Sequence, residues 1–137
     1  MWWIYALLAA LFAALTTIFA KAGLKNINSD LATAIRTIVI LIMVWGIAYF
    51  RGETKNIQHI PKNDLLFLVI SGLAAGASWL FYFKALQIGR ASQVAPIDKS
   101  SLALVIILSV LFLGEPLTWK VAAGALLIIG GTIVLIL

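Results

Sequence analysis

The chain has 137 residues, of which 64% are hydrophobic and only 11% are charged. An ordinary soluble domain is about 45–50% apolar and about 25% charged, so a soluble fold of this length cannot hide so much apolar surface. The net charge of +5 comes from Lys and Arg residues spread singly between apolar runs, which argues against a nucleic-acid-binding face and favours lipid phosphates as partners. In lipid every backbone N–H and C=O must be satisfied within the chain, and the long apolar runs can do this as helices but lack the alternation of a barrel.

Five apolar runs are long enough to span a bilayer core about 30 Å thick, which needs roughly 20 helical residues. In chain order we expect helices at residues 1–20, 31–50, 65–83, 92–114 and 117–137. The first run is expected to be a membrane helix, because no Lys or Arg precedes it and it is about twice as long as the core of a secretory signal. The connections are short. The sequence therefore predicts an all-α integral membrane protein, with one domain of five transmembrane helices over residues 1–137.

Arg36 lies inside the second run, where a charged side chain costs at least about 2.5 kcal/mol unless it snorkels or pairs. Snorkelling toward the loop at residues 21–30 is one interpretation. The functional interpretation is that Arg36 binds an anionic group of a substrate, or pairs with Asp98 to lock one face of a cavity. Both interpretations fit the sequence.

Asp98 and Lys99 follow Pro96 and are expected in the first turns of the fourth helix, where a carboxylate can cap free N–H groups. Neighbouring residues point about 100° apart on a helix, so at least one of the two is expected to face the interior of a packed helix. For Asp98 we favour an ion-pair or gating role over a proton relay.

Further candidate site residues also have structural explanations. Trp45 and Trp79 lie inside the second and third runs and are candidate walls of a substrate cavity, with membrane anchoring or lipid contact as the alternative. Thr17 is a candidate ligand donor, although such hydroxyls often bond their own helix. Gly124 and Gly131 lie on one face of the last helix and predict a dimer interface, because small residues let helices approach closely in lipid. No catalytic set, metal cluster or cofactor loop is present, so we expect neither an enzyme nor a cofactor.

Eight of the ten basic residues lie in loops and divide evenly between the two membrane faces. Arg36 and Lys99 lie within spans and would make the division six against four, still a weak bias, if they snorkel outward. In a five-helix weave the first and third loops share one face, and the second and fourth loops share the other. Each pair of loops holds four basic residues: Lys21, Lys25, Lys84 and Arg90 against Arg51, Lys55, Lys62 and Lys120. The orientation of a membrane protein follows an excess of Lys and Arg on one face. Equal numbers on the two faces therefore predict that copies insert in both orientations. The alternative, equally compatible with the count, is that the basic residues of the second loop keep the N-terminus cytoplasmic.

The last third of the chain carries motifs of a known family: Ala85-Leu86, Ala91-Ser92, Ala95-Pro96, Leu113-Gly114-Glu115 and the helix from Gly124 to Gly131. With these motifs the chain resembles the EamA type of drug/metabolite transporter, and Arg36 matches a frequent family position. Typical members look like two five-helix repeats fused head to tail, the second inverted relative to the first. The resemblance therefore implies one EamA-like repeat that forms a homodimer, and the charge tie suggests an inverted partner copy.

The resemblance implies a transporter or exporter of small metabolites or drugs that works by alternating access. It also implies a multi-pass protein of the inner (plasma) membrane of a bacterial or archaeal cell. The alternative that the sequence leaves open is a non-transporting membrane subunit that stabilises or regulates a partner.

Overall fold

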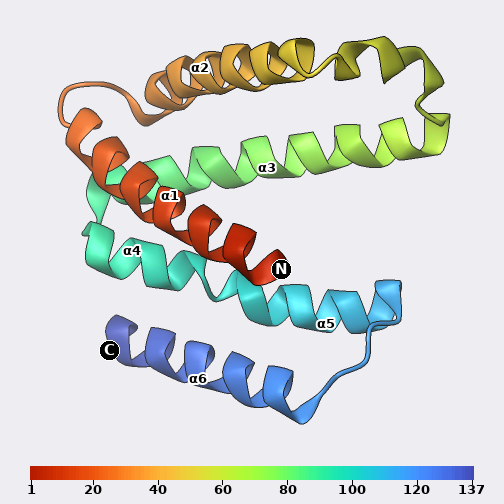
Figure 1. Ribbon diagram of the computed structural model, residues 1–137. Helices are drawn as coiled ribbons and strands as arrows, with labels where there is room; N and C mark the ends of the chain where they lie inside the picture. Colours follow the sequence, from red (N-terminus) through yellow and green to blue (C-terminus); the bar gives the residue numbers. More distant parts are fainter. The chain divides into compact units, whose positions relative to one another are not determined.

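A computed structural model describes residues 1–137 as an all-helical chain, which confirms the predicted fold class (Figure 1). Five helical spans are long and apolar enough to cross a membrane: Trp2–Gly23, Ser29–Phe50, Lys62–Ile88, Ala91–Leu113 and Trp119–Ile136. The first three are helices α1, α2 and α3, and the last is α6. The fourth consists of two helices, α4 (Ala91–Asp98) and α5 (Ser101–Leu113). A short 3-10 helix, η1 (Glu53–His59), lies in the connection between α2 and α3.

The contacts of the chain form two compact units, residues 1–18 with 89–137 and residues 19–88. In the second unit α2 and α3 run side by side in opposite directions, joined through η1 (Figure 1). In the first unit α6 packs against both α4 and α5. The helix pairs that pack in each unit are therefore close neighbours along the chain, although the first unit also includes residues 1–18, which are distant in sequence from the rest of it.

Side chains are exposed over almost the whole chain, which is the pattern of a protein whose apolar solvent is lipid. Only six residues are buried: Leu24, Ser29, Thr33, Phe83, Leu86 and Thr132. Three of the six are polar hydroxyl residues at helix contacts. Because lipid tails are as apolar as Leu, helices in a membrane associate through close packing of small residues and hydrogen bonds rather than through a hydrophobic core.

The helix ends are capped by local side chains and one glycine. Asn28 precedes α2, and its side chain accepts a hydrogen bond of 2.8 Å from the backbone N–H of Asp30. Thr118 does the same for α6 through the N–H of Val121. After α5, Gly114 has a φ of 65°, and the N–H of Glu115 returns to the carbonyl of Ser109. A residue without Cβ is needed at that left-handed position, which lets the chain reverse within a few residues.

The fourth span is interrupted, whereas the sequence predicted one continuous helix over residues 92–114. After Pro96 the ladder tightens: the N–H of Lys99 bonds Ala95, but the N–H of Ser100 bonds Ile97. The carbonyl of Pro96 thereby loses the donor that a continuous helix would supply. The hydroxyl of Thr132 on α6 lies 3.2 Å from this carbonyl and 2.9 Å from the carbonyl of Ile128. The single hydroxyl proton of Thr132 is shared between the two carbonyls, so a side chain of α6 replaces part of the missing hydrogen bond at the break.

Thr132→Val tests this role, because valine keeps the shape of threonine and removes the hydroxyl. We expect a lower midpoint of thermal unfolding, since hydrogen bonds between membrane helices contribute about 0.6 kcal/mol on average and up to about 1.7 kcal/mol. The matched control is Thr37→Val, because the Thr37 hydroxyl donates to Thr33 of its own helix at 2.8 Å. Equal midpoints for the two variants in one detergent would contradict a stabilising bond across the break.

Candidate functional site

The contact between α2 and α3 is a polar seam at the start of α2. Ser29 and Thr33 lie one turn apart on the face of α2 that is buried, with exposed fractions of 1% and 5%. The Thr33 hydroxyl donates to the carbonyl of Ser29 at 2.8 Å, so it is satisfied without a partner from another helix. On α3 the buried residues are Phe83 and Leu86. At this end of the α2 and α3 pair, the buried residues of α2 are thus small and polar, and those of α3 are large and apolar.

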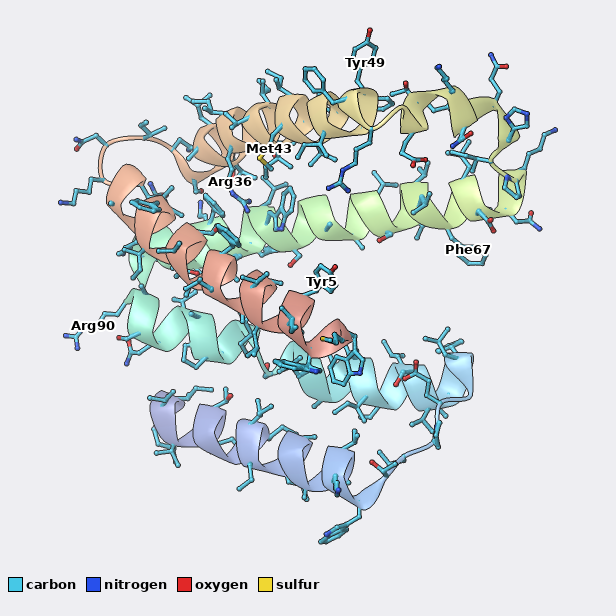
Figure 2. The ribbon with its side chains drawn as sticks, viewed as in Figure 1. Tyr5, Arg36, Met43, Tyr49, Phe67 and Arg90 are labelled. Atoms are coloured by element: carbon cyan, nitrogen blue, oxygen red, sulfur yellow. The ribbon has the colours of Figure 1, made fainter.

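Arg36 follows one turn after Thr33 and continues the same face of α2. Figure 2 shows Arg36 on the side of α2 that faces α3. Its guanidinium carbon lies 4.6 Å from the ring centroid of Trp79 and 5.1 Å from that of Phe83. Such cation–π contacts are worth about 0.5–1 kcal/mol at exposed sites and about 2 kcal/mol or more when desolvated. The group ends against the aromatic rings of α3 rather than extending freely to the membrane surface.

The guanidinium of Arg36 is not fully satisfied by these rings. Its Nη1 atom is buried and has no hydrogen-bond partner. An aromatic face attracts the charge, but it leaves the N–H groups in the guanidinium plane without acceptors, and a buried unsatisfied donor costs about 1–3 kcal/mol. An anionic group is the partner that this geometry lacks, because a carboxylate or phosphate accepts in that plane from a guanidinium. The arrangement is chemically suited to binding an anion.

Asp98 and Lys99 lie at the break in the fourth span. The prediction that Asp98 caps the start of a helix is wrong. Asp98 is the last residue of α4, so it lies at a helix C-terminus, where free carbonyls and not free N–H groups are found. Its carboxylate instead pairs with Lys99 at 3.4 Å, and the two side chains are 35% and 56% exposed. At about 1.5 Å per residue, the eight residues of α4 place the pair about 12 Å into the span that begins at Ala91.

The other predicted residues have local surroundings of their own. Trp45 is 53% exposed and makes no aromatic or cation–π contact. The Thr17 hydroxyl donates to the carbonyl of Ala13 on its own helix at 3.0 Å. On α6, Gly124 is half-buried and Gly131 is exposed, and a Cβ added at either would meet no atom within 4 Å. Of the predicted set, the structure thus brings together Arg36 with Trp79 and Asp98 with Lys99.

Sequence reasoning missed Phe83 as part of the cluster. The available signal was its spacing of four residues from Trp79, which places both rings on one face of a helix. The sequence does not say which helix that face meets, so the pairing with Arg36 needed the structure. His, Cys, Asp and Glu side chains are nowhere gathered into a group of three that could hold a metal ion.

Comparison with known proteins gives a consistent set of relatives. The model of the EamA-like transporter family matches residues 1–137. An uncharacterized transporter of Sinorhizobium, encoded in a cobO 3' region, is 52% identical over 134 residues, which cover 93% of this chain and 95% of the relative. An uncharacterized protein of Methanocaldococcus jannaschii is 34% identical over 132 residues, covering 96% and 93%. No solved structure matches.

A third relative is longer. The uncharacterized transporter YvbV of Bacillus subtilis is 29% identical over 126 residues, which cover 90% of this chain but 41% of the relative. The part of YvbV outside this match therefore exceeds the length of the match itself.

Arg36→Met tests whether the arginine is present for stability. Methionine retains an unbranched apolar stem and removes the buried unsatisfied donor, so we expect the thermal midpoint to stay unchanged or to rise. Phe83→Ala, at a residue that is 3% exposed, is the comparison and should lower the midpoint by truncating a buried ring. A fall for Arg36→Met as large as that for Phe83→Ala would mean that the cation–π stack holds the two helices together.

Proposed function

This chain belongs to the EamA-like transporter family and is a multi-pass membrane transporter for a small molecule, and we propose that it exports metabolites or drugs by alternating access between two copies of itself. The proposed location is the inner (plasma) membrane. The observation that carries the proposal is the Arg36 cluster: a guanidinium inside a membrane span, stacked on two rings, with a buried nitrogen that lacks a partner. An intramembrane charge that is retained at a cost is expected to serve function.

In the proposed mechanism Arg36 binds an anionic group of the substrate, and Trp79 and Phe83 form the wall against which it lies. Substrate binding then supplies the acceptor that the buried Nη1 atom lacks, so the bound state gains a charge-assisted hydrogen bond in apolar surroundings. Trp45 and Thr17 remain proposed additional contacts of the transport path. The site needs no cofactor, because binding and release involve no bond breaking.

The break between α4 and α5 is the proposed gate. Transporters commonly build substrate and ion sites from discontinuous helices, because irregular backbone inside a membrane persists only where it is covered by protein or lines a cavity. Asp98 and Lys99 pair at this break in the structure. Opening the pair exposes a carboxylate and an ammonium to the transport path, and closing it neutralises both. We therefore propose that this ion pair changes partners as access alternates.

Two features support a pair of copies as the working unit. The longer relative YvbV has room for a second stretch of the length matched here, as expected for a transporter with two fused repeats. On α6, as at the other glycines described, a Cβ added at Gly124 or Gly131 would meet no atom of another part of the chain within 4 Å, so a second copy could pack against this small-residue face. An antiparallel pair would supply the inverted second repeat, and the even charge distribution favours it.

The deciding experiment is a substrate screen on the purified protein in liposomes that reads binding and flux together. The probes are small metabolites and drugs with and without an anionic group, each compared with its neutral derivative. Saturable flux of anionic compounds supports the proposal. Binding of a partner protein without flux of any compound would instead support a non-transporting subunit.

Arg36→Met and Asp98→Asn should lower flux more than they lower thermal stability, if the two side chains bind substrate and gate the path. The controls are Glu53→Gln and the pair Arg90→Met with Lys62→Met, at exposed residues outside the proposed site. The pair removes one basic residue from each face and so keeps the charge balance even. Figure 2 shows Arg90 pointing away from the helices. We expect at least about a tenfold loss of flux for Arg36→Met, because a hydrogen bond to a charged group is worth about 1.5–3 kcal/mol. Loss of flux in proportion to loss of stability would point to a structural role.

Orientation gives an independent test of the antiparallel pair. The chain contains no cysteine, so single cysteines placed at Asn56 in the connection between α2 and α3 can be labelled selectively. We expect labelling from both sides of the membrane, because four basic residues on each face give no bias. Single-molecule counting in the same liposomes should find two copies.

Adding two or three Lys to one face should orient all copies one way and abolish flux, since orientation responds to Lys and Arg near helix ends. Co-expression of two variants biased in opposite directions should restore flux. Labelling of the unmodified chain from one side only would refute dual insertion and leave a parallel pair or a separate partner.

A further inference from the structure

A reciprocal set of hydrogen bonds ties the end of α3 to the connection between α1 and α2. The Lys21 ammonium donates to the carbonyls of Leu86 and Gln87 at the end of α3. In return, the Gln87 side-chain amide donates to the carbonyl of Ile27 at 2.8 Å and to that of Leu24 at 3.5 Å. We refer to the Lys21 and Gln87 side chains with these four carbonyls as the clasp.

The clasp uses groups that a helix end leaves free. The last carbonyls of a helix have no intrahelical donor and carry the negative end of the helix dipole, so an ammonium there gains both a hydrogen bond and a favourable charge interaction. Lys21 provides the ammonium at α3, and the amide of Gln87 provides a neutral donor for the connection after α1. Each side chain thus satisfies backbone acceptors of the other segment, and removing either one leaves carbonyls without donors.

Burial in this unit is confined to the end that carries the clasp. All five buried residues between positions 19 and 88 lie there: Leu24, Ser29, Thr33, Phe83 and Leu86. Leu86 is 0% exposed, whereas no residue from 34 to 82 is buried. Regions with few buried contacts open at low free energy, so α2 and α3 are held firmly at one end and weakly at the other.

The path of the chain places this end at both links between the two units. The chain leaves the first unit after Ile18 and returns to it at Gly89. Lys21 lies three residues after the first link, and Gln87 lies two residues before the second. Any motion of one unit that reaches the other along the chain therefore passes through segments that the clasp holds together.

From these observations we propose that the clasp is the fixed joint of the transporter, at which the last turn of α1 and the connection after it stay bound to the end of α3 in every state, while the opposite ends of α2 and α3 separate and close. The proposal rests on the proposed alternating access for its role in transport. The rigidity of the joint depends on packing and hydrogen bonds, so it can be measured without substrate.

The test compares the two ends of the α2 and α3 pair in the full-length chain, in liposomes of phosphatidylethanolamine and phosphatidylglycerol. Spin labels on cysteines at Asn26 and Ile88 report the clasp end. Labels at Tyr49 and Phe67, which Figure 2 shows pointing away from the contact of α2 with α3, report the other end. An excess of unlabelled chains dilutes the labelled ones, so that distances between labels on different copies do not contribute to the signal. We expect a narrow distance distribution at the clasp end and a wider one at the other end.

Gln87→Leu and Lys21→Met remove the donors and should widen the distribution at the clasp end. Gln93→Leu and Lys25→Met, at exposed residues of similar size, are the controls and should leave it narrow. Equal widths at the two ends of the unmodified chain would overturn the proposal, and so would an equal effect of clasp and control variants. The first comparison holds even where a clasp variant fails to fold. Absence of flux together with unequal widths would count against the transport mechanism alone.

Discussion

The need to satisfy backbone hydrogen bonds in lipid is the constraint on which the rest of this structure depends. It selects helices for all five spans, and it also determines where polar side chains form hydrogen bonds. The side chains that bridge distant segments, Lys21, Gln87 and Thr132, all donate to backbone carbonyls. Lys21 does so at the end of α3, Gln87 in the connection between α1 and α2, and Thr132 at the break in the fourth span, where regular helix bonding leaves acceptors free. Tertiary structure here consists largely of one segment completing the backbone of another.

Arg36 is an exception to this pattern of satisfied hydrogen-bonding groups. Its charge is met by two aromatic faces, while one of its nitrogens stays buried without an acceptor. The chain supplies side-chain donors to these free carbonyls, but it supplies no hydrogen-bond acceptor to the buried Nη1 atom of Arg36. Local rules are most often broken where function requires it, and the missing partner has the chemistry of an anion. The contrast with the satisfied carbonyls, more than the arginine alone, supports a binding role.

The sequence predicted the spans well because their signal is length and hydropathy, which act locally. It did not predict the break after Pro96, because proline is tolerated in membrane helices and the outcome depends on whether another helix offers a donor, as Thr132 does. The cluster at Arg36 was predictable only in part: the arginine stands out by its charge, but the rings that meet it lie more than forty residues away on α3. Asp98 was assigned to the wrong helix end for the same reason, since the break turned a helix start into a helix end.

The internal use of cations also bears on the proposed insertion in two orientations. Orientation is decided as the spans enter the membrane, so Lys21 counts in the balance of charge between the faces. Once the chain folds, its ammonium is bonded to the carbonyls of α3, Lys99 is paired with Asp98, and Arg36 is stacked on Trp79 and Phe83. These three cations then depend on partners within the chain rather than on the lipid head groups of one leaflet. The clasp, the proposed gate and the candidate binding site would therefore form alike in copies of either orientation, which is what the proposed antiparallel pair with two equivalent halves requires.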